Sequence, residues 1–171
     1  MKQFILVLLL VTSGAAAEAV SAKLTPLKES VSALRAEKPD FQEAAYVGAR
    51  LAALLTSMQG HLEENLPEDP ENKAGMLEVT KEIGERALLF FRVGAYLDLS
   101  FNQKSHTRIH EQRLLLVNSY GQEMVRGRQL NNSVMTPLIG EDMRLSRELF
   151  PLYEKMWLTI AQLAEKKADS K

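Results

Sequence analysis

The chain has 171 residues, of which 46% are hydrophobic and 25% are charged, and its net charge at pH 7 is −1. This composition is typical of one globular domain and excludes a chain that is disordered throughout. The near-neutral charge argues against nucleic acid as a partner. The lack of cysteine excludes disulfides, thiolate metal sites and covalently attached haem.

The first residues of the chain predict a secretory signal peptide. A positively charged start over 1–3 precedes an unbroken apolar run over 4–11, and small residues follow up to Ala19. This order of charged start, apolar core and small-residue end is that of a secretory signal, with cleavage after Ala17 or Ala19. The apolar run is too short to cross a bilayer, which takes about 20 residues. The alternative is an uncleaved N-terminal anchor with the run extended to Val20, and Glu18 within that stretch argues against it.

The predicted signal divides the chain into two parts. Residues 1–19 form the cleaved signal peptide, and residues 20–171 form a single domain. We therefore expect an exported protein, periplasmic if the source is Gram-negative and otherwise secreted, with no membrane span after cleavage.

The residue types of the mature part predict an all-helical fold. Good helix formers dominate, and no stretch alternates apolar and polar residues for long enough to suggest a sheet. The first helix is expected over 25–37. Thr25 would cap it, Pro26 suits its first turn, and Pro39 ends it because the residue before a proline resists helical geometry.

The second and third helices carry apolar residues at seven-residue spacing. Asp40, with Glu43 three residues on, predicts the start of the second helix, and Asp69 before Pro70 predicts the start of the third, which runs to about Ser100. Both helices would pack lengthwise against their neighbours. The rows that predict this packing are Phe41, Gly48, Leu55 and Leu62; Ala44, Leu51 and Met58; Met76, Ile83, Phe90 and Leu97; and Thr80, Ala87 and Gly94.

Two glycines in these rows, Gly48 and Gly94, predict a close approach of helices, since a glycine on a packing face lets backbones meet.

The fourth helix is expected over 105–130, and the fifth from Pro137 onward, where Pro151 would kink it or split it in two. Four long amphipathic helices joined by short turns predict an antiparallel bundle, with the short N-terminal helix across one end or along one side. The apolar face expected for the fourth helix consists of Leu114, Val117, Gly121 and Met124, flanked by Leu115, Leu116 and Tyr120.

Two histidines of the fourth helix, His106 and His110, are candidate metal ligands. They stand four residues apart and share a helix face, as two ligands of one ion can. They do not form a His-Glu-x-x-His motif, and a third ligand would have to come from another helix. His61 is a candidate partner of His110 and, with Met58, a candidate haem ligand. The competing interpretation of His106 and His110 is a solvated helix end. A further alternative for His110 is partial burial, because it shares the phase of Leu114.

Charged residues suggest pairing between helices. Asp142 is in phase with Leu149 and Met156, so burial is expected, and a buried carboxylate needs a partner. The candidate partners are Arg113, Arg126 and Arg128. Basic residues gather over 104–147. They form either a patch that binds an anionic ligand or solvated helix faces whose charges are paired with those of adjacent helices. Acidic residues gather over 63–71, where capping and solubility are the expected roles.

No nucleophile elbow, phosphate loop, dinucleotide fingerprint or paired-carboxylate constellation is present in the sequence. The sequence therefore predicts a non-enzymatic binding or protein-interaction module without a cofactor, which acts through its helix faces. Self-association would use apolar surface at Leu115, Leu116 and Trp157. The alternative is a periplasmic metal- or haem-binding bundle that uses His110 with His106 or His61.

Overall fold

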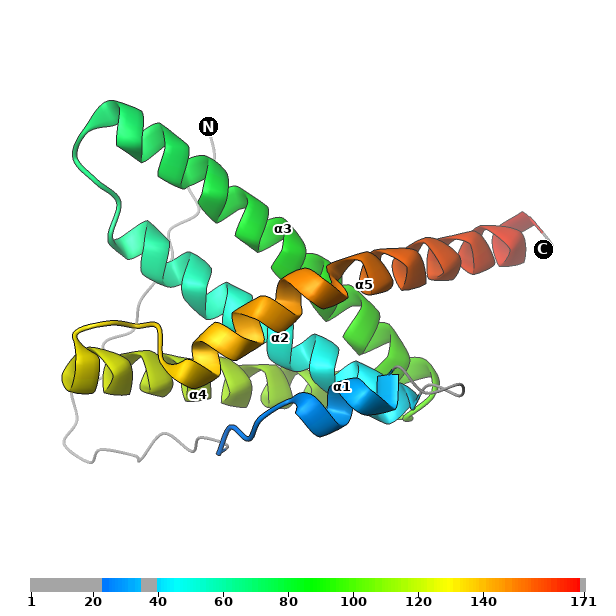
Figure 1. The fold of residues 1–171 in the computed structure, drawn as a ribbon. Coiled ribbons are helices and arrows are strands. Elements are labelled where there is room, and N and C mark those ends of the chain that lie inside the picture. The colour runs from blue at the N-terminus through cyan, green and yellow to red at the C-terminus, as the bar shows by residue number, and fades with distance from the viewer. Residues whose placement is uncertain (1–22, 35–39, 170–171) are drawn as a thin grey trace, which may run out of the picture.

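The computed structural model describes residues 23–34 and 40–169. Over these residues the chain contains helices and no strand, and five helices pack against each other (Figure 1), which confirms the predicted all-α helical bundle. The helices are α1 (Lys28–Leu34), α2 (Phe41–Glu64), α3 (Pro70–Ser100), α4 (His106–Asn131) and α5 (Pro137–Asp169).

Two predictions concern residues outside the described ranges: the signal peptide over 1–19 and the end of the first helix at Pro39. In the part of the chain that is described, none of the helices carries an apolar stretch long enough to span a bilayer.

Side chains at the N-termini of three helices explain where these helices begin. The Asp40 carboxylate accepts hydrogen bonds from two amides in the first turn of α2, at 2.8 and 3.2 Å. Asp69 accepts one hydrogen bond from an amide of α3 at 3.0 Å, and Ser105 accepts one from an amide of α4 at 3.3 Å. Such caps satisfy amides that have no partner within the helix, and the three predicted starts are confirmed. The cap predicted for the first helix is wrong: α1 begins at Lys28, and the Thr25 carbonyl accepts a hydrogen bond from α2 instead.

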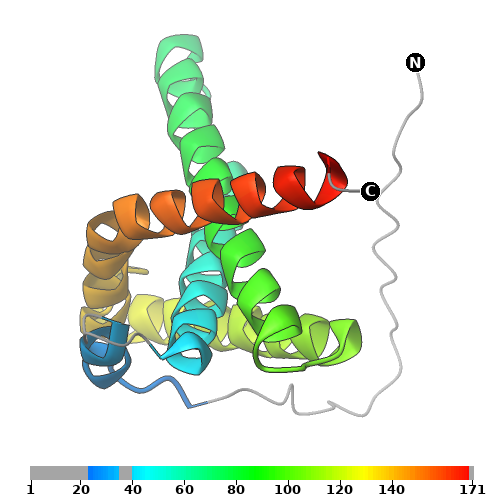
Figure 2. The same cartoon turned by 90° about the vertical axis from the view of Figure 1, so that its right-hand side faces the viewer.

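α2 is the central helix, since it contacts α1, α3, α4 and α5. α2 and α3 run antiparallel, α4 passes beneath them, and α5 runs along the front of the pair before it turns around their side (Figures 1 and 2). Between residues 44 and 58, α2 is buried on nearly all sides, as expected of a helix that is apolar all round.

The core forms two clusters on either side of α2. The first joins α1, α2, α3 and α5 and includes Phe90 and Tyr153. The second joins α2 and α4 to the start of α5 and includes Leu54 and Ile139. In the first cluster the Tyr153 hydroxyl donates a hydrogen bond to the carbonyl oxygen of Ala44 at 2.5 Å, so this buried phenol is satisfied.

α2 and α3 cross at Gly48 and Gly94. A Cβ atom on Gly48 would lie 3.0 Å from the carbonyl oxygen of Phe90 and 3.3 Å from the Cα atom of Gly94. A Cβ atom on Gly94 would lie 3.0 Å from the carbonyl oxygen of Ala45. The two backbones therefore meet where the glycines lie, which confirms the predicted close approach.

Pro151 lies inside α5, which continues as one helix from Pro137 to Asp169. The helix bends in its middle, as Figure 2 shows most clearly. A proline lacks the amide of an intrahelical hydrogen bond, and its ring clashes with the preceding turn. The helix is therefore bent and not split, and its second half extends beyond the body of the bundle.

The apolar face predicted for α4 is confirmed in part, by Met124 and by the flanking Leu116 and Tyr120. His110 and Leu114 are exposed, whereas Leu116, Tyr120 and Met124 are buried against α2. The alternative of partial burial for His110 is therefore wrong. α4 carries apolar residues on two adjacent faces, and the face that includes Tyr120 is the one that contacts α2.

Candidate functional site

Three side chains from three helices form a buried triad: Arg50 of α2, Tyr120 of α4 and Asp142 of α5. Their exposed fractions are 0%, 0% and 1%. Arg50 donates from Nη2 to Asp142 Oδ2 at 2.7 Å and from Nε to the Tyr120 hydroxyl at 2.9 Å. The Tyr120 hydroxyl donates to the same Oδ2, and Arg50 Nη1 donates to the carbonyl oxygen of Thr25. The triad thus joins α2, α4, α5 and the segment before α1.

Burial and charge act in opposite directions on the ionisation of the triad. Burial alone would lower the pKa of Arg50, but its interactions with Tyr120 and Asp142 raise it above the usual value. Burial raises the pKa of Asp142 above its usual value, although the hydrogen bond from Tyr120 and the charge of Arg50 act in the opposite direction. Burial also raises the pKa of Tyr120, which keeps its proton. We take Arg50 and Asp142 as ionised, because a neutral Asp142 would leave the Arg50 charge buried without a countercharge.

The second oxygen of Asp142, Oδ1, is buried and has no hydrogen-bond partner among the described residues. An unpaired buried acceptor is unfavourable. The buried hydrogen bonds of the triad hold α2, α4, α5 and the segment before α1 together.

The burial predicted for Asp142 is confirmed, but the predicted partners are wrong. Arg50, the one charged residue over 44–58, takes their place. The three predicted partners are engaged elsewhere: Arg113 over the ring of Phe91 at 4.4 Å, Arg126 with Glu123 at 2.6 Å, and Arg128 with His61 at 2.7 Å. A lone arginine in an otherwise apolar, central stretch was the signal in the sequence that pointed to a buried partner.

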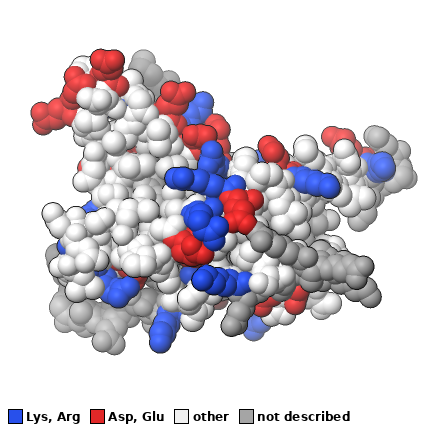
Figure 3. Space-filling model, in the orientation of Figure 1, with Lys and Arg blue, Asp and Glu red and all other residues white. Residues whose placement is uncertain are grey.

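Charged side chains are distributed unevenly over the surface. Acidic residues gather at the turn between α2 and α3, at the upper left of Figure 3. Basic side chains of the predicted patch over 104–147 are in part neutralised by neighbouring carboxylates. The ion pairs are Lys104–Asp98, Arg126–Glu123, Arg144–Glu141 and Arg144–Glu148.

The predicted histidine ligands lie in two separate places. His106 and His110 are exposed at the start of α4, whereas His61 contacts Arg128 near the end of α4. Arg128 and His110 are 18 residues apart on one helix, which corresponds to about 27 Å. The structure therefore does not bring His61 to His110. Within 23–34 and 40–169, no group of three or more histidine, aspartate or glutamate residues could hold a metal ion, and metal binding stays a prediction.

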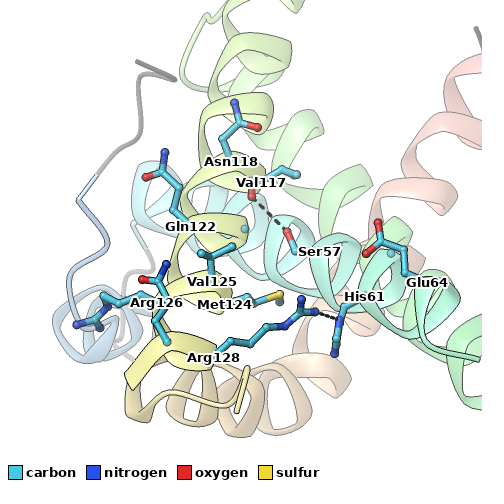
Figure 4. Close-up of a pocket in the computed structure, with 13 residues that line it drawn as sticks. Ser57, His61, Glu64, Val117, Asn118, Gln122, Met124, Val125, Arg126 and Arg128 are labelled. Carbon is cyan, nitrogen blue, oxygen red and sulfur yellow. Dashed lines mark hydrogen bonds between the residues drawn. The ribbon is translucent and has the colours of Figure 1, made fainter. Parts of the chain in front are cut away.

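A groove of about 620 Å³ lies between the second half of α2 and the second half of α4, and we call it the α2–α4 groove. Figure 4 shows Arg128 and His61 pointing toward each other from the two helices, and the Ser57 hydroxyl donating to the Val117 carbonyl oxygen at 3.3 Å. Its lining residues are Ser57, Gly60, His61, Glu64, Val117, Asn118, Gly121, Gln122, Met124, Val125, Arg126, Arg128 and Gln129.

A second groove, of about 340 Å³, lies between the second half of α5 and the adjoining ends of α2 and α3, and we call it the α5 groove. The rings of Phe41 and Phe101 stack in it with centroids 4.5 Å apart. Its lining is apolar or aromatic except for Lys155 and Thr159. The lining residues are Phe41, Tyr96, Leu97, Phe101, Leu152, Lys155, Met156, Thr159, Ile160 and Leu163.

The apolar surface predicted for self-association is only partly available. Leu116 is 2% exposed and belongs to the second core cluster, so this part of the prediction is wrong. Trp157 is partly buried against the first cluster, with the Arg92 guanidinium 5.6 Å above its ring. The α5 groove, which the sequence did not predict, is lined by Met156, the residue before Trp157 in the chain.

Comparisons with known protein families, with curated proteins and with solved structures find no match to this chain.

Proposed function

We propose that the chain is an exported, non-enzymatic interaction module that binds an amphipathic helix of a partner protein in the α5 groove. The observation that carries the proposal is the exposed, continuous apolar lining of this groove. Phe41, Phe101 and Leu163 are 41%, 52% and 52% exposed. Single exposed apolar residues are ordinary, whereas a contiguous patch of them is typical of an interaction site.

The shape of the groove favours a helical occupant. One wall is the stretch of α5 from Leu152 to Leu163, which extends over about 17 Å at 1.5 Å per residue. The opposite wall contains the stacked Phe41 and Phe101. A helix with apolar residues at every third or fourth position would place about three turns of side chains between these walls.

The charges beside the groove favour an acidic partner. Lys155 lines the groove, and Lys166, 11 residues on, lies on the same side of α5 three turns later. Neither lysine forms an ion pair with any described residue. Glu154 and Glu165 each precede a lysine by one position, so they lie about 100° around the helix. A second copy of α5 would bring lysines together, whereas a helix with acidic flanks would neutralise them.

The proposed binding can be tested with a synthetic helix. A peptide of about 14 residues, with leucines on one face and glutamates beside them, is titrated into the mature protein by calorimetry, and so is the same peptide with lysine in place of glutamate. We expect the acidic peptide to bind at least about tenfold more tightly than the basic one. Leu163→Glu should abolish binding because it places a charge in the apolar groove.

Charge reversal supplies the control. Lys155→Glu should weaken binding of the acidic peptide and strengthen binding of the basic one. Lys81→Glu makes the same change on α3, away from the groove, and should alter the binding of neither peptide. Equal binding of the two peptides, or unchanged binding to the Leu163→Glu variant, would contradict the proposal.

Export is tested independently of binding. Expression with the intact N-terminus in a Gram-negative host should yield periplasmic protein whose first residue, by mass spectrometry, is Glu18 or Val20. Recovery of the full-length chain in the cytoplasm alone would contradict export and would leave the proposed binding untouched.

A further inference from the structure

The α2–α4 groove is distinct from the α5 groove. His61 and Phe41 lie at opposite ends of α2, 20 residues and so about 30 Å apart. Its volume is in the range of small-molecule sites. What the groove binds can be inferred from its floor and from the arginine at one end.

The arginine is held in place by a histidine. Arg128 Nη2 lies 2.7 Å from His61 Nδ1, and Asn65 Nδ2 lies 3.0 Å from the same atom. Guanidinium and amide nitrogens are donors only, so Nδ1 must accept and the proton of His61 must be on Nε2. The contact with His61 therefore orients Arg128 without giving it a countercharge.

The charge of Arg128 has no countercharge in the described parts of the chain, since none of their carboxylates forms an ion pair with it. Arg126, two residues earlier, is engaged by both oxygens of Glu123 at 2.6 and 2.9 Å. In Figure 4 Arg128 points toward α2, whereas Arg126 points the opposite way. Arg128 is thus the cation that the groove offers to a ligand.

The floor of the groove is apolar and unfilled. Val117, Met124 and Val125 line it from α4. Gly60 and Gly121 line it from the two helices, and a Cβ atom on either would meet no atom within 4 Å. The missing side chains therefore leave space that an apolar chain could occupy.

We propose that the α2–α4 groove binds a single-chain amphiphile with a monoanionic headgroup, a carboxylate. The headgroup accepts hydrogen bonds from Arg128, whose fork of donors matches a carboxylate, and the chain lies over Gly60 and Gly121. Glu64 also lines the groove. It would repel a doubly charged headgroup such as a phosphate monoester, which is why one negative charge fits best.

The probe is dodecanoate below its micellar concentration, titrated into the mature protein by calorimetry, with dodecylammonium as the probe of opposite charge. We expect dodecanoate to bind and dodecylammonium to bind at least about tenfold more weakly. Arg128→Gln should weaken the binding of dodecanoate about tenfold. Arg108→Gln removes the same charge from α4 outside the groove and should have no effect.

Filling the groove is the second test. Gly121→Leu should abolish dodecanoate binding without unfolding the protein, because the site is open and leucine favours a helix more than glycine does. Gly75→Leu, at an equally open position on α3, should leave binding intact. Equal binding of the two probes, or undiminished dodecanoate binding to Arg128→Gln or Gly121→Leu, would overturn the proposal. Loss of dodecanoate binding in Leu163→Glu would also overturn it, since the chain would then lie in the α5 groove.

Discussion

Replacing Arg50 with methionine is expected to lower the free energy of unfolding by about 3–5 kcal/mol, because it removes one partner of a buried ion pair. Asp142 would keep its charge in a site closed to solvent, with its Oδ1 atom already without a hydrogen-bond partner among the described residues. The Thr25 carbonyl would also lose the donor that Arg50 supplies. Urea unfolding followed by circular dichroism measures the change.

The double variant Arg50→Met with Asp142→Leu is the control for this interpretation. It removes both charges, so it is expected to be more stable than Arg50→Met alone, since apolar replacement of a whole buried pair is often close to neutral. Tyr120→Phe should lower the free energy of unfolding by about 1–3 kcal/mol, because it deletes a neutral hydroxyl. This is less than the loss expected when either charge is removed alone. If the change in free energy of unfolding of the double variant equals the sum of the changes in the two single variants, Arg50 and Asp142 do not interact.

Gly48→Ala and Gly94→Ala are each expected to destabilise the protein by about 1–3 kcal/mol, although alanine favours a helix more than glycine does. The added methyl groups would meet carbonyl oxygens of the facing helix at 3.0 Å, and backbone atoms cannot turn aside as a side chain can. α2 and α3 would have to separate at their crossing, and the first core cluster would lose packing.

Gly121→Ala is the matched control for these two changes. It also adds one methyl group to a helix, but at a position with no atom within 4 Å. It should therefore stabilise the protein by up to about 1 kcal/mol, the difference in helix propensity. Thermal unfolding of the three variants separates the effects, and a gain in stability for Gly48→Ala or Gly94→Ala would contradict the close crossing.

Features that depend on neighbouring residues could be predicted from the sequence. The caps at Asp40, Asp69 and Ser105 are local, because each side chain bonds to amides two or three residues ahead. The crossing at Gly48 and Gly94 could be predicted as well, since both glycines interrupt rows of larger apolar residues.

Features that depend on distant residues could not be predicted in the same way. α4 has apolar residues on two adjacent faces, and only packing against α2 decides whether the face with Leu114 or the face with Tyr120 is buried. The partner of Asp142 lies 92 residues earlier in the chain, and three other arginines were equally suitable by type. The α5 groove exists because Pro151 turns the end of α5 around the bundle, a direction that the residue sequence alone does not specify.

The position of Arg50 in the middle of α2 has a consequence for the order of folding. α2 and α3 are joined by a short turn, so their pairing is local and closes a small loop, whereas Asp142 reaches Arg50 only after 92 residues of chain have been arranged. Until α5 docks, the guanidinium has no countercharge in the core and favours hydration, which opposes collapse around α2. Docking of α5 and dehydration of Arg50 must therefore coincide, so the last helix in the chain makes folding of the domain cooperative.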